Sequence, residues 1–166
     1  MWLFHRVTTV TASDGVWHHI CVSWESSSGS WKFYKDGGLI EQDTSFKKGH
    51  VIKDGGTLVL GQDQDSVGGG FETADSFQGT LLNVNLWNKV LTAEQITKMS
   101  KSCLLDIEND AKVHKWINFL REAEARLVKP SSCQPFGSGT HTSYIMFKIL
   151  SFTRQLTKYK LRASVI

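Results

Sequence analysis

The stretch HHICVSWESSSGSWKFYKDGG, residues 18–38, decides the fold class. Its first seven residues alternate as in a strand, with one face formed by Ile20, Val22 and Trp24. Residues 27–29 favour a turn, residues 31–35 favour a second strand, and the DGG sequence at 36–38 is typical of a hairpin. The stretch therefore predicts antiparallel strands joined by tight turns.

The rest of the chain extends the same pattern. Turn signals recur about every 8–12 residues, which favours a β sandwich or barrel. The six tryptophans and 40% hydrophobic content suffice for a core, and we expect Trp17, Trp24, Trp31 and Trp87 to lie in it. Further strands are predicted at 7–12, 39–45, 57–61 and 77–87. A helix is predicted at about 92–100, because Thr92 and Gln95 have capping-box spacing. A weaker helical pattern covers 113–128.

An acidic, glycine-rich segment follows the apolar run that ends at Leu60. Residues 61–75 read GQDQDSVGGGFETAD and contain no cation. Crowded carboxylates repel one another unless they are solvated or share a cation. Ca²⁺ accepts six to eight oxygen ligands in flexible geometry, so the segment predicts either a calcium site or a solvated acidic loop. Its carboxylates and side-chain amides are Asp63, Asp65, Glu72, Asp75, Gln62 and Gln64.

Charge divides the chain near Cys133. Residues 134–166 hold five basic and no acidic residues. The pI of the whole chain, about 8.8, therefore reflects this tail and does not indicate nucleic-acid binding. We expect a domain at 1–133 and a basic tail at 134–166. The segment 144–162 is either an interfacial helix or a disordered or non-native sequence. The sequence has no apolar run of transmembrane length, and its start lacks the layout of a signal peptide.

Three motifs in order resemble the pentraxin family. Residues 19–26 (HICVSWES) match its signature of His, any residue, Cys, any residue, Ser or Thr, Trp, any residue, Ser or Thr. Residues 58–65 (LVLGQDQD) and 68–72 (GGGFE) are similar to its calcium loop. Residues 83–88 (NVNLWN) and 91–96 (LTAEQI) are similar to the strand and helix that come next. The resemblance covers about residues 10–133 and implies an all-β, concanavalin-like jelly-roll sandwich with one short helix.

The resemblance also implies two bound Ca²⁺ ions. By position, Asp63 and Asp65 would be side-chain ligands, and Gln64 would contribute its backbone carbonyl. Glu72 would bridge the ions, and Asp75 stands where the family often has Gln. A bridging carboxylate would lower the repulsion between two neighbouring cations.

The chain also departs from the family pattern. It begins about midway through such a domain, so the first strands, an Asp-Asn ligand pair and one cysteine are expected to be missing. The resemblance then leaves Cys21 outside any intrachain disulfide and implies a Cys103–Cys133 bridge. A loop of that length would contribute about 3–4 kcal/mol.

The function implied is a non-enzymatic, calcium-dependent, lectin-like recognition domain, secreted or part of a larger extracellular protein. Its ligands would be phosphate- or sugar-bearing molecules or extracellular proteins, and it could form a homo-oligomer. The alternative is a structural or adhesion module with a vestigial calcium site. Zinc binding by His18, His19 and Cys21 lacks a second ligand pair. No triad spacing indicates a hydrolase, and the loop carboxylates suit a glycosidase pair poorly because nothing indicates a raised pKa.

Overall fold

An antiparallel three-stranded unit forms the best-defined part of the sheet. In it β1 (Trp17–Glu25) pairs with β2 (Ser30–Lys35), and β2 pairs with β3 (Gly38–Asp43). The computed structural model describes residues 12, 14–52, 56–77, 79–101, 112–116, 118, 144–151 and 160–163. Asp36 and Gly37, with φ of 53° and 84°, make the two-residue turn between β2 and β3. The hairpin predicted from residues 18–38 is confirmed, and β3 ends two residues earlier than expected.

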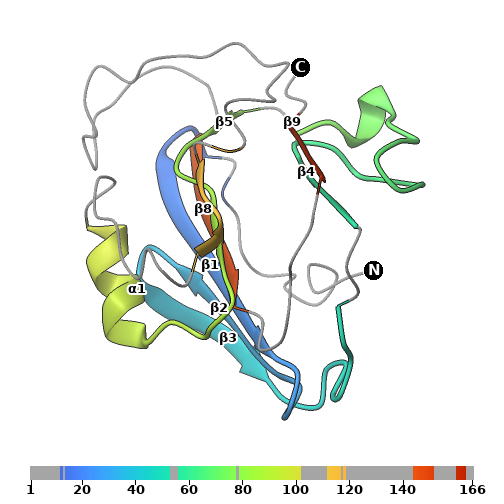
Figure 1. Cartoon of the computed structure of the whole chain (residues 1–166). Helices are drawn as coiled ribbons and strands as arrows, with labels where there is room; N and C mark the ends of the chain where they lie inside the picture. Colours follow the sequence, from blue (N-terminus) through green and yellow to red (C-terminus); the bar gives the residue numbers. More distant parts are fainter. Residues whose placement is uncertain are drawn as a thin grey trace.

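The remaining strands extend this unit into a seven-stranded sheet of mixed direction. The order is β3-β2-β1-β8-β6-β7, and β5 also pairs with β8. β8 runs parallel to β1, beside which it lies in Figure 1. A second, two-stranded sheet pairs β4 with β9 in parallel. The additional strands are β4 (Thr57–Leu60), β5 (Thr80–Leu81), β6 (Asn85–Trp87), β7 (Lys112–His114), β8 (Tyr144–Ser151) and β9 (Lys160–Ala163).

The core occupies both faces of β1, because this strand is buried along almost its whole length. Ile20, Val22 and Trp24 pack with Trp31 and Phe33 of β2, as the alternation predicted. The opposite face contributes Cys21 to a second cluster, whose other members are Tyr34, Trp87, Leu91, Ile96 and Met99. Trp24, Trp31 and Trp87 are buried, which confirms their assignment to the core, whereas Trp17 is half-buried.

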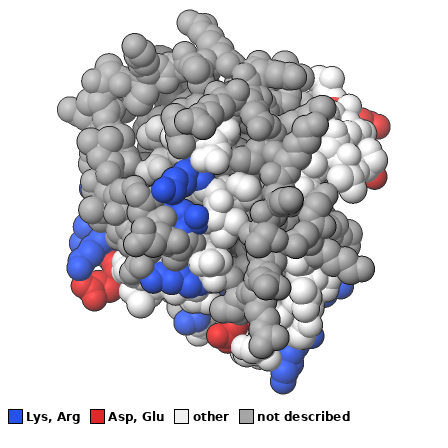
Figure 2. All heavy atoms as spheres, viewed as in Figure 1, with Lys and Arg blue, Asp and Glu red and all other residues white. Residues whose placement is uncertain are grey.

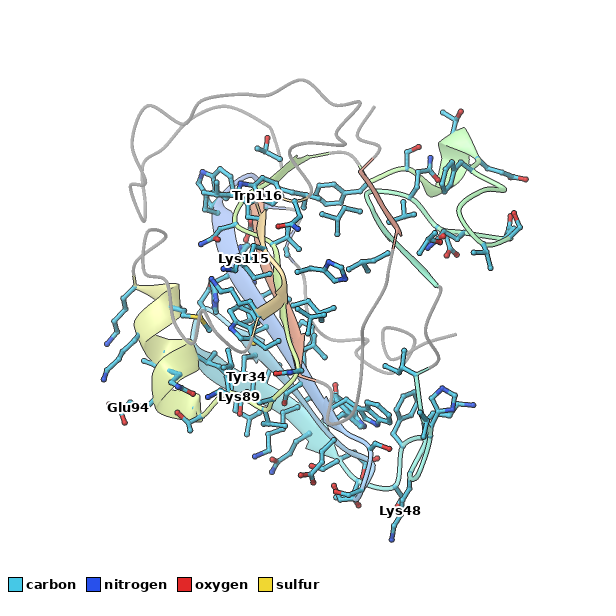
Figure 3. The ribbon with its side chains drawn as sticks, in the orientation of Figure 1. Tyr34, Lys48, Lys89, Glu94, Lys115 and Trp116 are labelled. Atoms are coloured by element: carbon cyan, nitrogen blue, oxygen red, sulfur yellow. The ribbon has the colours of Figure 1, made fainter. Side chains whose placement is uncertain are left out.

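The helix α1 (Ala93–Ser100) covers this second cluster. Thr92 Oγ1 accepts a hydrogen bond from Gln95 N at 3.2 Å, and Gln95 Oε1 accepts one from Thr92 N at 2.8 Å. Ile96 and Met99 are fully buried, whereas Glu94 points away from the sheet (Figure 3) and pairs with Lys98 at 2.7 Å. The predicted capping box and helix are therefore confirmed.

The far end of α1 contacts the turn between β2 and β3. Thr97 Oγ1 donates a hydrogen bond to Gly37 O at 3.2 Å. A Cβ atom at Gly37 would clash with Ser100 Oγ, so only glycine permits the close approach of the turn to α1. The hairpin and the helix are thus fixed to each other.

Three local predictions need correction. The continuous strand expected at 77–87 is interrupted between β5 and β6, where Asn83 adopts a positive φ of 56°. Lys112–His114 forms β7, so the weaker helix does not begin at Val113. Within 144–162 the described residues belong to strands, so the interfacial helix is wrong there.

Several predictions fall on other parts of the chain. Most of the strand at 7–12, all of residues 119–143, Cys103 and Cys133 lie outside the described residues. The Cys103–Cys133 bridge therefore stays a prediction. The domain boundary at 133 also stays a prediction, although β8, which lies beyond it, runs within the main sheet. Among the described residues, strands dominate and α1 is short, which is the all-β class expected.

Candidate functional site

The acidic segment forms a closed loop between β4 and β5. Phe77 N donates a hydrogen bond to Gly61 O at 2.9 Å, and this bond joins the two ends of the loop. In Figure 1 the loop extends outward from β4 on the right of the molecule, and acidic atoms lie at the same edge in Figure 2. The site predicted from sequence therefore lies on one projection, anchored where Leu60 enters a small core cluster with Val84.

Gln62 connects the two arms of this loop. Its Nε2 donates to Glu72 O at 2.9 Å and to Ser76 Oγ. Its Oε1 is buried and has no hydrogen-bond partner among the described residues. The amide thus links the arm that carries Asp63 and Asp65 to the arm that carries Glu72.

Gln64 holds the loop to β4. Its Oε1 accepts hydrogen bonds from Thr57 Oγ1 at 2.6 Å and from Gly68 N at 2.9 Å, and its Nε2 donates to Thr57 O at 3.3 Å. These bonds occupy the side-chain amide. The resemblance assigns the backbone carbonyl of Gln64 to calcium, and that role stays a prediction.

The glycines fold the tip of the loop back onto its first arm. Ser66 and Gly69 exchange backbone hydrogen bonds of 3.1 and 3.3 Å. Gly70 has a φ of +74°, and a Cβ atom there would lie 2.7 Å from Asp65 Cβ. Such an approach is open only to glycine, so the triple glycine brings the second arm against Asp65.

The predicted carboxylate ligands lie on the outside of this frame. The side chains of Asp63, Asp65 and Glu72 are exposed. Asp63 Oδ1 accepts a hydrogen bond from Gln64 N at 2.8 Å. Glu72 is the N-cap of the short 3-10 helix η2 (Thr73–Asp75). The backbone of Asp75 is the last position of this helix, and its side chain is not among the described parts of the structure.

The structure brings the ligand-bearing arms together without converging their carboxylates. Among the described residues, no three His, Cys, Asp or Glu side chains form a group that could hold a metal ion. The donor set nevertheless fits Ca²⁺ in chemistry, because it consists of carboxylate and carbonyl oxygens on a glycine-rich loop. An ion would therefore need the carboxylate side chains to move before they could complete its coordination.

A second polar cluster was not anticipated from sequence. His18 Nδ1 lies 2.8 Å from Asp36 Oδ2, and His18 Nε2 lies 2.9 Å from each carboxylate oxygen of Asp14. The hydrogen bond from His18 holds the pKa of Asp14 below its usual value. Asp36 Oδ1 also accepts a hydrogen bond from His19 N at 2.9 Å. The cluster fixes the start of β1 to the β2–β3 turn, which is a structural role for His18.

Asn85 has a similar structural role next to the loop. Its side chain is buried, donates to Asn83 O at 2.8 Å and accepts a hydrogen bond from Trp116 N at 3.1 Å. Trp116 packs against Leu60 and Val84, the cluster beneath the loop. Figure 3 shows Trp116 and Lys115 following β7. Within the motif at 83–88, Val84 and Asn85 thus support the loop through the core cluster at its base and are not part of the loop itself.

Comparison with known proteins identifies the family. The profile described as "Pentaxin family" matches residues 4–128, which include β1 and the whole acidic loop. The chain belongs to the pentaxin family. Accordingly, the fold is the concanavalin-like β sandwich that the motifs implied, with α1 as its short helix. No solved structure matches the chain.

Relatives of this pentaxin chain include proteins of different architecture. It is 38% identical over 122 residues to the rat "Sushi, von Willebrand factor type A, EGF and pentraxin domain-containing protein 1", covering 74% of this chain and 3% of that protein. It is 43% identical over 88 residues to human neuronal pentraxin-2, covering 53% and 20%. It is 40% identical over 87 residues to human pentraxin-4, covering 52% and 18%. The chain thus spans less than a quarter of each relative.

The described part of the chain contains no helix long and apolar enough to cross a membrane.

Proposed function

We propose that this chain is a non-enzymatic, calcium-dependent recognition domain that acts outside the cell. The ions would be held by the side chains of Asp63, Asp65, Glu72 and Asp75 and by the backbone carbonyl of Gln64. The observation that carries the proposal is the closed loop, in which two amides and a close glycine contact hold two carboxylate-bearing arms together.

The chemistry supplied by the bound ions would be direct coordination of ligand oxygens at open sites. Ligands with phosphate or acidic sugar groups suit such sites, because they offer hard anionic oxygens. The protein would orient the ions and leave part of their coordination facing solvent, which the exposure of Asp65 and Glu72 allows. Binding is expected to be lectin-like, and assembly into a homo-oligomer stays a prediction.

The extracellular assignment is supported by the relatives. One of them is named for sushi, EGF and von Willebrand domains beside its pentraxin domain. EGF-type domains are disulfide-dense modules of oxidising, extracellular compartments. A chain with 38% identity to part of that protein fits the same environment.

Calorimetric titration of Ca²⁺ into the full chain and into a Glu72→Gln variant tests the proposal. We expect the parent to bind with a Kd below 1 mM, on the order of extracellular or tighter calcium sites. The variant should bind at least about tenfold more weakly, because it loses the charge of the expected bridging ligand. No binding by the parent would refute the calcium function. If the parent does bind Ca²⁺, a column bearing a phosphate monoester should retain it in the presence of Ca²⁺ and release it in EDTA.

A structural or adhesion module is the second candidate. It is favoured by the absence, within the described residues, of a converged group of three metal-ligating side chains. In that case EDTA should leave the melting temperature unchanged. If calcium binds, saturating Ca²⁺ at about 100 times its Kd should stabilise the fold by about 2.7 kcal/mol, and EDTA should remove this increment.

A further inference from the structure

Gln62 differs from the other amide of the acidic loop, Gln64, because its side chain bonds to the arm that carries Glu72. Its Nε2 donates to Glu72 O, which can only accept, and to Ser76 Oγ. The opposite orientation of the amide would place two acceptor oxygens against each other. The orientation is therefore fixed by the backbone of the arm that carries Glu72.

The bond acts at the point from which the second arm takes its geometry. Glu72 is the N-cap of η2, with φ of −117° and ψ of 143°. The residue at 72 thus leads directly into η2, whose last residue is Asp75. Gln62 immediately precedes Asp63 in the other arm. A single side chain thus relates the expected ligand positions of the two arms.

The buried Oε1 of Gln62 supports a role beyond folding. It has no hydrogen-bond partner among the described residues. Buried polar atoms are nearly always paired, and an exception calls for an explanation such as an ion or an ordered water. Gln62 adjoins the predicted ligand Asp63, so a hydrated cation at the proposed site is a group that would satisfy its Oε1.

We propose that Gln62 is a positioning residue for the calcium loop, which holds the backbone of the Glu72 arm against the arm that carries Asp63 and Asp65. This inference rests on the proposed calcium function. Residues that orient metal ligands without binding the metal typically change metal affinity 10- to 100-fold when they are replaced. Gln62 would belong to this class.

The test is calorimetric titration of Ca²⁺ into the full chain carrying Gln62→Met. Methionine keeps the length of the side chain and removes both the bond to Glu72 and the unsatisfied oxygen. We expect the Kd for Ca²⁺ to rise about tenfold, while thermal melting without Ca²⁺ stays cooperative and close to that of the parent. Gln42→Met, at an exposed position on β3, is the matched control and should leave the Kd unchanged.

A double-mutant cycle identifies the route of action. If Gln62 acts by placing Glu72, adding Gln62→Met to Glu72→Gln should weaken binding further by less than about threefold. A tenfold effect in both backgrounds would overturn positioning through Glu72, and equal Kd values for parent and Gln62→Met would overturn the role of Gln62 altogether. Failure of the parent to bind Ca²⁺ would instead overturn the proposed function. If Gln62→Met does not melt cooperatively, Ser76→Ala removes one partner of the same amide, and an unchanged Kd in that variant would also count against the inference.

Discussion

Replacing Gly70 with alanine should open the acidic loop. Gly70 has a φ of +74°, where an alanine is strained by about 1–2 kcal/mol. The added Cβ would also lie 2.7 Å from Asp65 Cβ and 3.2 Å from Asp65 N, so one arm of the loop must move. Overpacking of this kind costs about 1–3 kcal/mol. The two penalties together amount to about 2–5 kcal/mol, which falls on the contact between the arms.

Gly49→Ala is a matched control for the backbone strain. Gly49 has a φ of +76°, and a Cβ atom there would meet nothing within 4 Å. Its replacement should therefore carry the strain of about 1–2 kcal/mol without the collision. The difference between the two variants isolates the contact with Asp65.

Amide hydrogen exchange measures the opening where it occurs. The amides of Gly69 and Phe77 donate to Ser66 O at 3.1 Å and to Gly61 O at 2.9 Å, so they report on the tip and the base of the loop. A local penalty of 2 kcal/mol or more should reduce their protection about 30-fold or further in Gly70→Ala, up to the full stability of the loop. Gly49→Ala should leave both amides unchanged. Unaltered protection of Gly69 in Gly70→Ala would refute this reasoning.

The remaining predictions concern the core, the helix and pH. Met99→Ala should lower the free energy of unfolding by about 2–5 kcal/mol in urea titrations, because Met99 is fully buried on the inner face of α1, and a loss below 1 kcal/mol would contradict this packing. Thr92→Ala should lower it by about 1 kcal/mol, since the capping bond to Gln95 N is lost, and an unchanged urea midpoint would count against the cap. Burial lowers the pKa of His114 below 6.5, so the unfolded state binds a proton first as pH falls. Stability should therefore decline as pH falls through 6.5 until the folded-state pKa is passed. Urea midpoints at pH 8 and pH 5 should show this decline in the parent and less of it in His114→Gln, and a flat parent profile would contradict it.

Local sequence signals predicted the elements whose causes are local. The alternation around Val22 and the pair Asp36-Gly37 fix β1, β2 and their turns, because strand period and positive φ depend on neighbouring residues. The Thr92–Gln95 capping box likewise defines its own helix. The continuous strand predicted at 77–87 was wrong, because tertiary contacts decide the backbone there. The alternation of apolar and polar residues continues past Asn83, but the strand is interrupted there because Asn83 has a positive φ. Next to this break, Asn85 forms hydrogen bonds with Asn83 and with the distant Trp116.

The candidate site likewise has one part that could be predicted from the sequence and one part that could not. Composition identified the acidic loop, since carboxylates and glycines are visible along the sequence. The residues that close the loop could not be recognised, because Gln62, Gln64 and Thr57 act through partners up to 14 residues away. Uncharged amides between carboxylates were the available signal, and they had been interpreted only as further oxygen donors.

The bonds that close the loop largely avoid its carboxylates. They use the amides of Gln62 and Gln64 and backbone atoms at Gly61 and Phe77. Of the loop carboxylates whose side chains the structure describes, Asp63 is the exception, since its Oδ1 accepts a hydrogen bond from Gln64 N. Neutralising Asp65 or Glu72 should therefore leave the frame intact while removing charge that a cation needs, so such variants separate ion binding from folding. Replacing Asp63 should disturb both, because one of its oxygens already shapes the backbone on which the neighbouring ligand is carried.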